Sequence, residues 1–118
     1  MEDRTSESIW RTAAVRDRRY SIRYPFAADA QLLNLETGST SSGISSDLSL
    51  GGIFMCSSKL FALGCRVRLV LTRKSQVVEA LATVRIVKPG IGMGIEFLDV
   101  KAPFDQTLFR WIEQLRRK

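Results

Sequence analysis

The sequence predicts an all-β domain, a barrel or a sandwich, followed by one C-terminal helix. Short segments with apolar residues at alternating positions recur along the chain, which is typical of half-buried strands. Turn signals such as Glu36-Thr37-Gly38 and Pro89-Gly90 separate these segments at close, regular spacing. Strands and helices do not alternate along the chain, so a parallel α/β sheet is not expected.

Six segments are expected to be strands, and turn residues bound them. The second of these segments, at residues 39–48, is rich in serine, so its outer face is expected to be exposed to water. Gly51-Gly52 interrupts this strand before a short apolar strand begins. Glycine at such a place often marks a bulge or a close approach to the backbone. In the segment that begins at Cys65, apolar and charged residues alternate strictly at first. The expected strands cover residues 28–35, 39–48, 53–56, 65–71, 76–87 and 93–97.

Residues 103–117 are expected to form an amphipathic helix. Pro103 stands where helices tolerate proline, Asp105 lies in the first turn, and three basic residues end the chain, as the helix dipole favours. Five apolar residues fall on one face, namely Phe104, Leu108, Trp111, Ile112 and Leu115. We expect this face to pack over an open side of the barrel; binding to a partner is the alternative.

Length and charge set the organisation. The 118 residues suit one domain at 16–118, preceded by a polar, flexible leader at 1–15. A net charge of +6 favours phosphate-bearing or acidic partners. No secretory signal and no apolar run long enough to span a membrane are present, so a cytoplasmic protein without membrane insertion is expected.

The side-chain inventory argues against catalysis. The chain has no histidine, which removes the commonest general base and a common metal ligand. Cys56 and Cys65 are expected to be reduced core thiols, although a disulfide across a hairpin is the alternative. No paired-carboxylate pattern is present either. We expect no enzyme, no metal and no cofactor.

A cluster of arginines precedes the first strand. Five arginines stand against one aspartate between residues 11 and 23, and Arg19 and Arg23 are four residues apart, just before Pro25. A guanidinium is a planar fork of donors that suits phosphate and the O6/N7 edge of guanine. A solvated basic lead-in is the structural alternative.

A second polar stretch, Asp47-Leu48-Ser49-Leu50, precedes the two glycines. Residues two apart on a strand share a face, so Asp47 and Ser49 are expected on one side, with Leu48 and Leu50 directed into the core. A carboxylate accepts hydrogen bonds and suits the N–H groups of guanine. A local turn is the alternative, because Asp-x-Ser-x-Gly-Gly also favours turn hydrogen bonds.

Together these stretches resemble the PilZ domain family of bacterial cyclic di-GMP receptors. Arg19-x-x-x-Arg23 matches the family's R-x-x-x-R motif, and Asp47-x-Ser49-x-x-Gly52 matches its [D/N]-x-S-x-x-G motif. The segment Gly92–Phe97 is similar to the family's last strand, and the likeness extends from about residue 16 to the C-terminus. Lys59-Leu60 departs from the family's usual proline-leucine, in a connecting loop only.

The resemblance implies a six-stranded, antiparallel, Greek-key-like barrel with a C-terminal helix. It implies that the arginine segment wraps over the barrel when cyclic di-GMP binds. The arginines would hold phosphates and guanines, with the acid and hydroxyl on the opposite wall. Arg18 would add a contact, and one or two ligand molecules would bind. The implied partner is an unidentified downstream protein. The expected ligand-binding residues are Arg18, Arg19, Arg23, Asp47, Ser49, Gly51 and Gly52.

Two other functions are alternatives to a cyclic di-GMP receptor. A nucleic-acid-binding barrel would use the basic residues between positions 59 and 88. However, the strand aromatics Phe54 and Phe97 are both expected to face the core, which leaves no stacking platform, so nucleic acid is not the expected partner. A PilZ-like scaffold that contacts only proteins would lack the motif residues, and here every motif position is filled.

Overall fold

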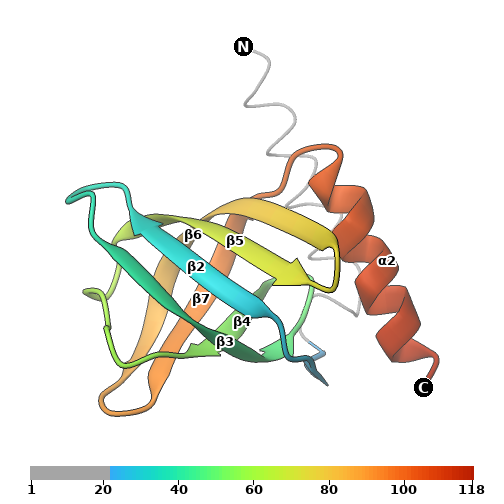
Figure 1. Ribbon diagram of the computed structural model, residues 1–118, viewed down its shortest axis with the longest axis horizontal. Helices are drawn as coiled ribbons and strands as arrows, with labels where there is room; N and C mark the ends of the chain where they lie inside the picture. The colour runs from blue at the N-terminus through green and yellow to red at the C-terminus, as the bar shows by residue number, and fades with distance from the viewer. Residues whose placement is uncertain (1–21) are drawn as a thin grey trace.

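A computed structural model of the protein describes residues 22–118. This part of the chain forms seven strands and one helix (Figure 1). The proposed leader at 1–15 lies outside it. The elements are β1 (Tyr24–Pro25), β2 (Asp29–Asn34), β3 (Thr40–Leu48), β4 (Gly52–Cys56), β5 (Arg66–Arg73), β6 (Gln76–Lys88), β7 (Gly92–Asp99) and α2 (Phe104–Arg116).

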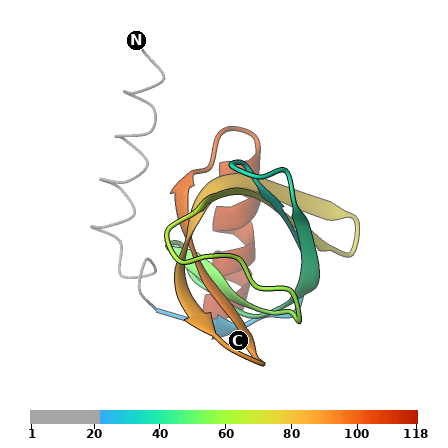
Figure 2. The same ribbon diagram turned by 90° about the vertical axis from the view of Figure 1, so that its left-hand side faces the viewer.

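Six of the strands close into an antiparallel barrel. Their order is β3-β2-β5-β6-β7-β4, and pairing of β4 with β3 closes the ring that Figure 2 shows end-on. The pairs β2–β5 and β4–β7 join strands that are not consecutive in the sequence. The six-stranded barrel with a C-terminal helix is therefore confirmed. A seventh strand, the two-residue β1, is not among the predicted strands and pairs with the end of β3.

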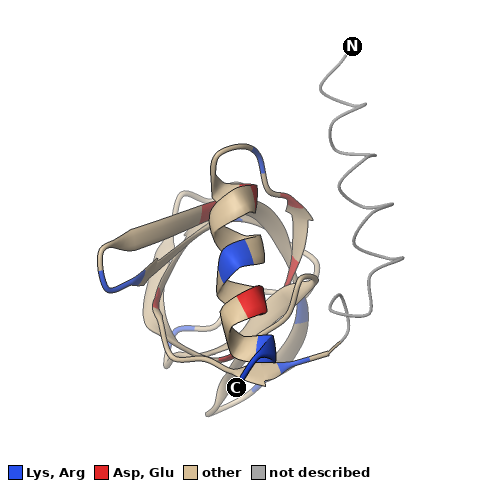
Figure 3. Cartoon of the chain, turned by 90° about the vertical axis from the view of Figure 1, so that its right-hand side faces the viewer, with Lys and Arg blue, Asp and Glu red and all other residues tan. Residues whose placement is uncertain are grey.

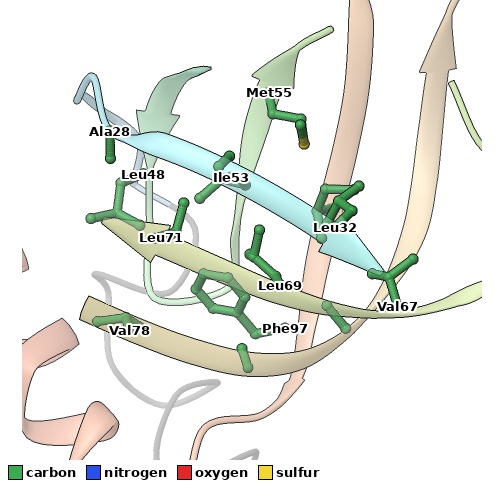
Figure 4. Packing of buried hydrophobic residues seen from close by; sticks show 14 of the residues in the cluster. Ala28, Leu32, Leu48, Ile53, Met55, Val67, Leu69, Leu71, Val78 and Phe97 are labelled. Carbon is green, nitrogen blue, oxygen red and sulfur yellow. The ribbon is translucent and has the colours of Figure 1, made fainter. Parts of the chain in front are cut away.

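Alternating apolar side chains fill the barrel. In β2 every second residue is buried, and the largest inward side chains meet on the barrel axis (Figure 4). Full burial of each such side chain stabilises the fold by about 1.5–3 kcal/mol. Fully buried side chains include Leu32, Leu48, Ile53, Met55, Val67, Leu69, Leu71 and Phe97.

The outer face of the serine-rich β3 is exposed, as expected, whereas the expectation that both cysteines lie in the core needs correction. The serine-rich β3 also turns serines inward: Ser45 is 2% exposed, and its Oγ donates to the Phe26 carbonyl at 2.6 Å. Its Oγ also accepts from the Ala28 N–H, so the buried hydroxyl is satisfied. Both cysteines are free thiols, but only Cys65 is in the core, because Cys56 is exposed at the end of β4.

The helix covers one end of the barrel. Figure 2 shows α2 behind the far mouth, while the loop between β4 and β5 crosses the near one. The face of α2 that lies toward the barrel buries its own residues Leu108, Trp111 and Ile112. The Trp111 ring lies 5.1 Å from the Phe26 ring, and its Nε1 donates to Gln76 Oε1 at 2.8 Å. The expected packing of the apolar face against the barrel is thus observed.

The helix bounds agree with the expected 103–117 to within one residue at each end. Within residues 22–118 no helix has the length and apolar character that crossing a membrane requires.

Candidate functional site

The two motifs meet where β1 joins β3. Pairing of Tyr24 with Leu48 and of Pro25 with Asp47 brings the preceding arginine beside the end of β3. Arg23 Nη1 lies 2.7 Å from Asp47 Oδ1, and the two side chains are 48% and 26% exposed. The structure therefore brings one residue of each motif together at a surface that a solute can reach.

A bulge turns Asp47 outward. The β3–β4 register passes from Ser45 opposite Met55 to Asp47 opposite Phe54, which leaves Ser46 as the extra residue. The extra residue shifts the alternation, so that Leu48 stays in the core while Asp47 faces out. The Phe54 N–H donates to Asp47 Oδ1 at 3.0 Å. None of the described residues donates to Asp47 Oδ2, which is available to a ligand donor.

Ser49 forms the turn after β3. Its Oγ accepts from the N–H groups of Gly51 and Gly52 at 3.1 and 3.2 Å, and the residue is only 2% exposed. These are the local turn bonds of the structural alternative. Leu48 and Leu50 are fully buried, as the sequence predicts. Direct contact between Ser49 and a ligand stays a prediction.

Gly52 is required by the strand pairing. A Cβ at this position would lie 2.0 Å from the Ile95 carbonyl oxygen of β7, a contact that the backbone cannot tolerate. The neighbouring Gly51 accepts from the Phe97 N–H at 2.8 Å, which fixes the turn against the same strand. Close approach of a ligand to Gly51 or Gly52 stays a prediction.

An open pocket of about 480 Å³ lies beside this junction. Arg23, Ser49 and Gly51 form the part that the motifs contribute. The rest comes from β6 and β7, outside the predicted set of site residues: Arg85, Ile86, Gly94, Ile95 and Glu96.

The residues from β6 and β7 add a second cation–acid pair. Arg85 Nε donates to Glu96 Oε1 at 2.5 Å. Gly94 pairs with Ile86, which is 46% exposed, and a Cβ at Gly94 would lie 3.0 Å from the Ile86 Cβ, so the glycine makes room for that side chain. No signal in the sequence would have placed Arg85 here, because a register shift between Val84 and Ile86 interrupts the alternation.

The pocket is built for polar recognition. Its lining offers the Arg23 and Arg85 guanidiniums and the Glu96 carboxylate, and the Asp47 carboxylate lies beside it, bound to Arg23. This donor and acceptor set suits a polar, anionic ligand. Within residues 22–118 no group of histidine, cysteine and acidic residues has the arrangement that a metal ion needs. Arg18 and Arg19 lie outside the described residues.

Phe54 does not face the core, contrary to expectation. It is half-buried on the outer face of β4, and Lys88 Nζ lies 5.4 Å from the ring centroid. Its neighbours Ile53 and Met55 take the inward positions. Phe97 is fully buried, as expected. One aromatic ring is therefore accessible near Asp47.

Comparisons with known structures agree on the fold. A PilZ domain from CeSA of a cellulose-synthesizing bacterium has a TM-score of 0.64 at 19% identity, covering 81% of this chain and 99% of that one. The PilZ domain of Escherichia coli YcgR, solved with c-di-GMP, has a TM-score of 0.65 at 21% identity over 86% of this chain and 93% of that one.

A third similar structure belongs to a longer protein. MotI/DgrA, an inhibitor of motility from Bacillus subtilis, has a TM-score of 0.67 at 22% identity, covering 86% of this chain and 52% of that one. No curated protein sequence matches significantly. The family model for the PilZ domain matches residues 17–114, which include both motifs, the barrel and most of the helix. The chain therefore belongs to the PilZ domain family.

Proposed function

We propose that this chain is a bacterial cytoplasmic receptor for cyclic di-GMP that acts as an adaptor on a downstream protein. The observation that carries the proposal is the contact between Arg23 and Asp47 beside an open pocket, because the two residues come from the two matched motifs. Membership in the PilZ family and the similarity to the YcgR domain solved with c-di-GMP support it.

The chemistry of the site suits this ligand. Cyclic di-GMP carries two phosphates and two guanines. A guanidinium can bind a phosphate or the O6/N7 edge of guanine bidentately, at about 1–3 kcal/mol for each good base contact. The Oδ2 atom of Asp47 can accept from the N–H groups of guanine. Arg23 would exchange its exposed pair with Asp47 for a charge-assisted contact with the ligand.

Other residues have distinct roles in this proposal. Arg18 and Arg19 add cations from the segment that precedes Arg23. Arg85 and Glu96 supply a second donor and a second acceptor across the pocket. Ser49, with Gly51 and Gly52, holds the turn that shapes the pocket wall. We propose recognition without catalysis, since the chain has no histidine to transfer a proton.

Calorimetric titration of the full chain tests this function. Cyclic di-GMP should bind with a Kd on the order of 1 μM, about −8 kcal/mol, and cyclic di-AMP more weakly. The stoichiometry separates one bound nucleotide from two. Arg23→Ala and Asp47→Ala should each abolish measurable binding, while Arg68→Ala, an exposed arginine outside the pocket, should leave it unchanged. Unaltered affinity in both motif variants would contradict the assignment of those residues.

The accessible ring of Phe54 beside Lys88 favours a second candidate, a nucleic-acid-binding barrel. Single-strand binding usually uses several stacking rings, and of the other described strand aromatics Phe97 is buried and Tyr24 is half-buried in β1. Salt-sensitive binding of single-stranded DNA or RNA, with no heat from cyclic di-GMP, would support this candidate. A folded protein that binds neither ligand would instead be a protein-interaction scaffold.

A further inference from the structure

A second hollow lies at the other side of β1, between the barrel and the C-terminal end of α2. It has a volume of about 740 Å³, and Tyr24, Pro25 and Phe26 line it together with Leu115 of the helix. An adjoining hollow of about 300 Å³ shares Phe26 and Leu115 with it. We call the two together the helix-end groove.

The helix-end groove is strongly basic. Its charged lining residues are Arg73, Lys74, Arg116 and Lys118, and none of the acidic side chains within residues 22–118 lines either part. Arg116 lies 3.1 Å from Glu113, outside the groove, but no described carboxylate pairs with Arg73, Lys74 or Lys118. Figure 3 shows basic segments at the C-terminal end of α2 and at the β5–β6 turn, on the face that the helix covers.

The cations stand around an apolar lining that is held in place. The Arg73 guanidinium lies 4.5 Å over the Phe26 ring and donates to the Ala27 carbonyl at 3.5 Å. Phe26 in turn packs on Trp111. Arg73 is therefore pre-organised, so little side-chain entropy is lost when an anion binds to it.

The lining indicates which kind of partner fits. Phe26 and Trp111 are only 5% and 3% exposed, so their rings cannot act as stacking platforms for bases. A recessed groove suits an extended chain better than the flat surface of a bilayer. Tyr24, Pro25 and Leu115 offer apolar contacts among the cations, which fits a peptide with both acidic and apolar side chains.

The groove and the nucleotide pocket share one short segment. Arg23 lines the pocket, and the next three residues line the groove. Because Tyr24 and Pro25 pair with Leu48 and Asp47, the same two-residue strand connects the Arg23–Asp47 contact with the groove. We propose that the helix-end groove binds an acidic, apolar-containing segment of a partner protein. Resting on the proposed function, we further propose that cyclic di-GMP changes this affinity through residues 24–26.

A labelled synthetic peptide of glutamate, leucine and serine tests the groove, with glutamine and lysine versions of the same peptide as controls. Fluorescence anisotropy with the full chain should detect binding of the glutamate peptide only, weakening as salt rises. Lys74→Glu combined with Lys118→Glu should weaken binding at least about tenfold. The matched control, Arg66→Glu with Arg68→Glu, makes the same charge change at exposed residues outside the groove and should change binding less than about threefold.

Several results would overturn the groove proposal. One is that the glutamate peptide does not bind, and another is that the control variant loses as much peptide affinity as the groove variant. A third is that single-stranded DNA or phosphatidylserine vesicles displace the peptide at a lower concentration than the peptide itself requires for binding. NMR amide shifts upon peptide binding should cluster at residues 24–26, 73–76 and 111–118. A cluster elsewhere would likewise contradict the assignment.

A separate measurement tests the coupling between nucleotide binding and peptide binding. Saturating cyclic di-GMP should shift the peptide Kd by at least about threefold, and the peptide should shift the nucleotide Kd by the same factor. Asp47→Ala should remove the shift. Nucleotide binding with no peptide binding would overturn this inference alone. Peptide binding without nucleotide binding would instead overturn the proposed function together with the coupling.

Discussion

Arg23 and Asp47 are 24 residues apart in the sequence and in direct contact in the structure, with Nη1 2.7 Å from Oδ1. Each residue supplies the other's counter-charge at the edge of the pocket. Because both side chains are partly exposed, water and salt screen this contact. A ligand that offers both a phosphate and N–H donors can therefore replace it at little cost to the fold.

The first prediction concerns the strength of this pair. A double-mutant cycle of Arg23→Ala and Asp47→Asn, measured by urea denaturation, should give a coupling free energy below about 1 kcal/mol that decreases as salt rises. Asparagine is chosen because its oxygen can still accept from the Phe54 N–H. A coupling of about 3 kcal/mol would mean that the contact is a structural tie, and the exchange with ligand would then be costly.

The second prediction concerns the glycine of the second motif. Gly52→Ala should lower the free energy of unfolding by at least about 2 kcal/mol, because its Cβ would overlap the Ile95 carbonyl and separate β4 from β7. Gly38→Ala is the matched control: its φ is +81°, but no heavy atom lies within 4 Å, so it should lose only about 1 kcal/mol. Similar losses in the two variants would argue against steric crowding at Gly52.

The third prediction concerns the contact between the helix and the barrel. Trp111→Ala should destabilise the protein by about 3–5 kcal/mol, since the ring is 3% exposed and packs on Phe26. Trp111→Phe keeps most of the packing but loses the hydrogen bond to Gln76, so the loss should be nearer 1 kcal/mol. Thermal unfolding of both variants, with exposed Leu63→Ala as a control, separates packing from hydrogen bonding. Equal losses in the two Trp111 variants would contradict this account.

The fourth prediction concerns the two thiols. Burial, with a smaller effect from the charge of Glu36, raises the pKa of the Cys65 thiol above its ordinary value. Since the thiolate is the reactive form, Cys65 should react slowly with a disulfide reagent near neutral pH, whereas exposed Cys56 should react at once. Because its pKa is raised, the Cys65 rate should go on rising at pH values where the rate of an ordinary small-molecule thiol has levelled off. Rapid labelling of both thiols in the native protein would contradict the buried position.

The sequence predicts the six long strands because alternation and turn residues are local signals. It does not reveal the bulge at Ser46, since an extra residue looks like any other in a serine-rich strand. It also misplaces Phe54, because the run Ile53–Cys56 is apolar throughout and carries no alternation that tells one face from the other.

The candidate site is predictable only in part, for the same reason. Asp47 and Arg23 belong to recognisable motifs, and the structure brings them together. Arg85 and Glu96 reach the pocket because β6 and β7 pair across a register shift, a relationship between residues that no local pattern encodes. Ser49 has the motif's residue type, yet its hydrogen bonds are those of a turn.

The closed ring of strands has a consequence for behaviour at high concentration. Since β4 pairs with both β3 and β7, β1 is the one strand within residues 22–118 that has a neighbouring strand on one side only. This strand is two residues long, and Pro25 has no N–H to offer. At β1 a second molecule thus finds almost no backbone template on which to add a strand, which should limit edge-to-edge aggregation through this end of the sheet.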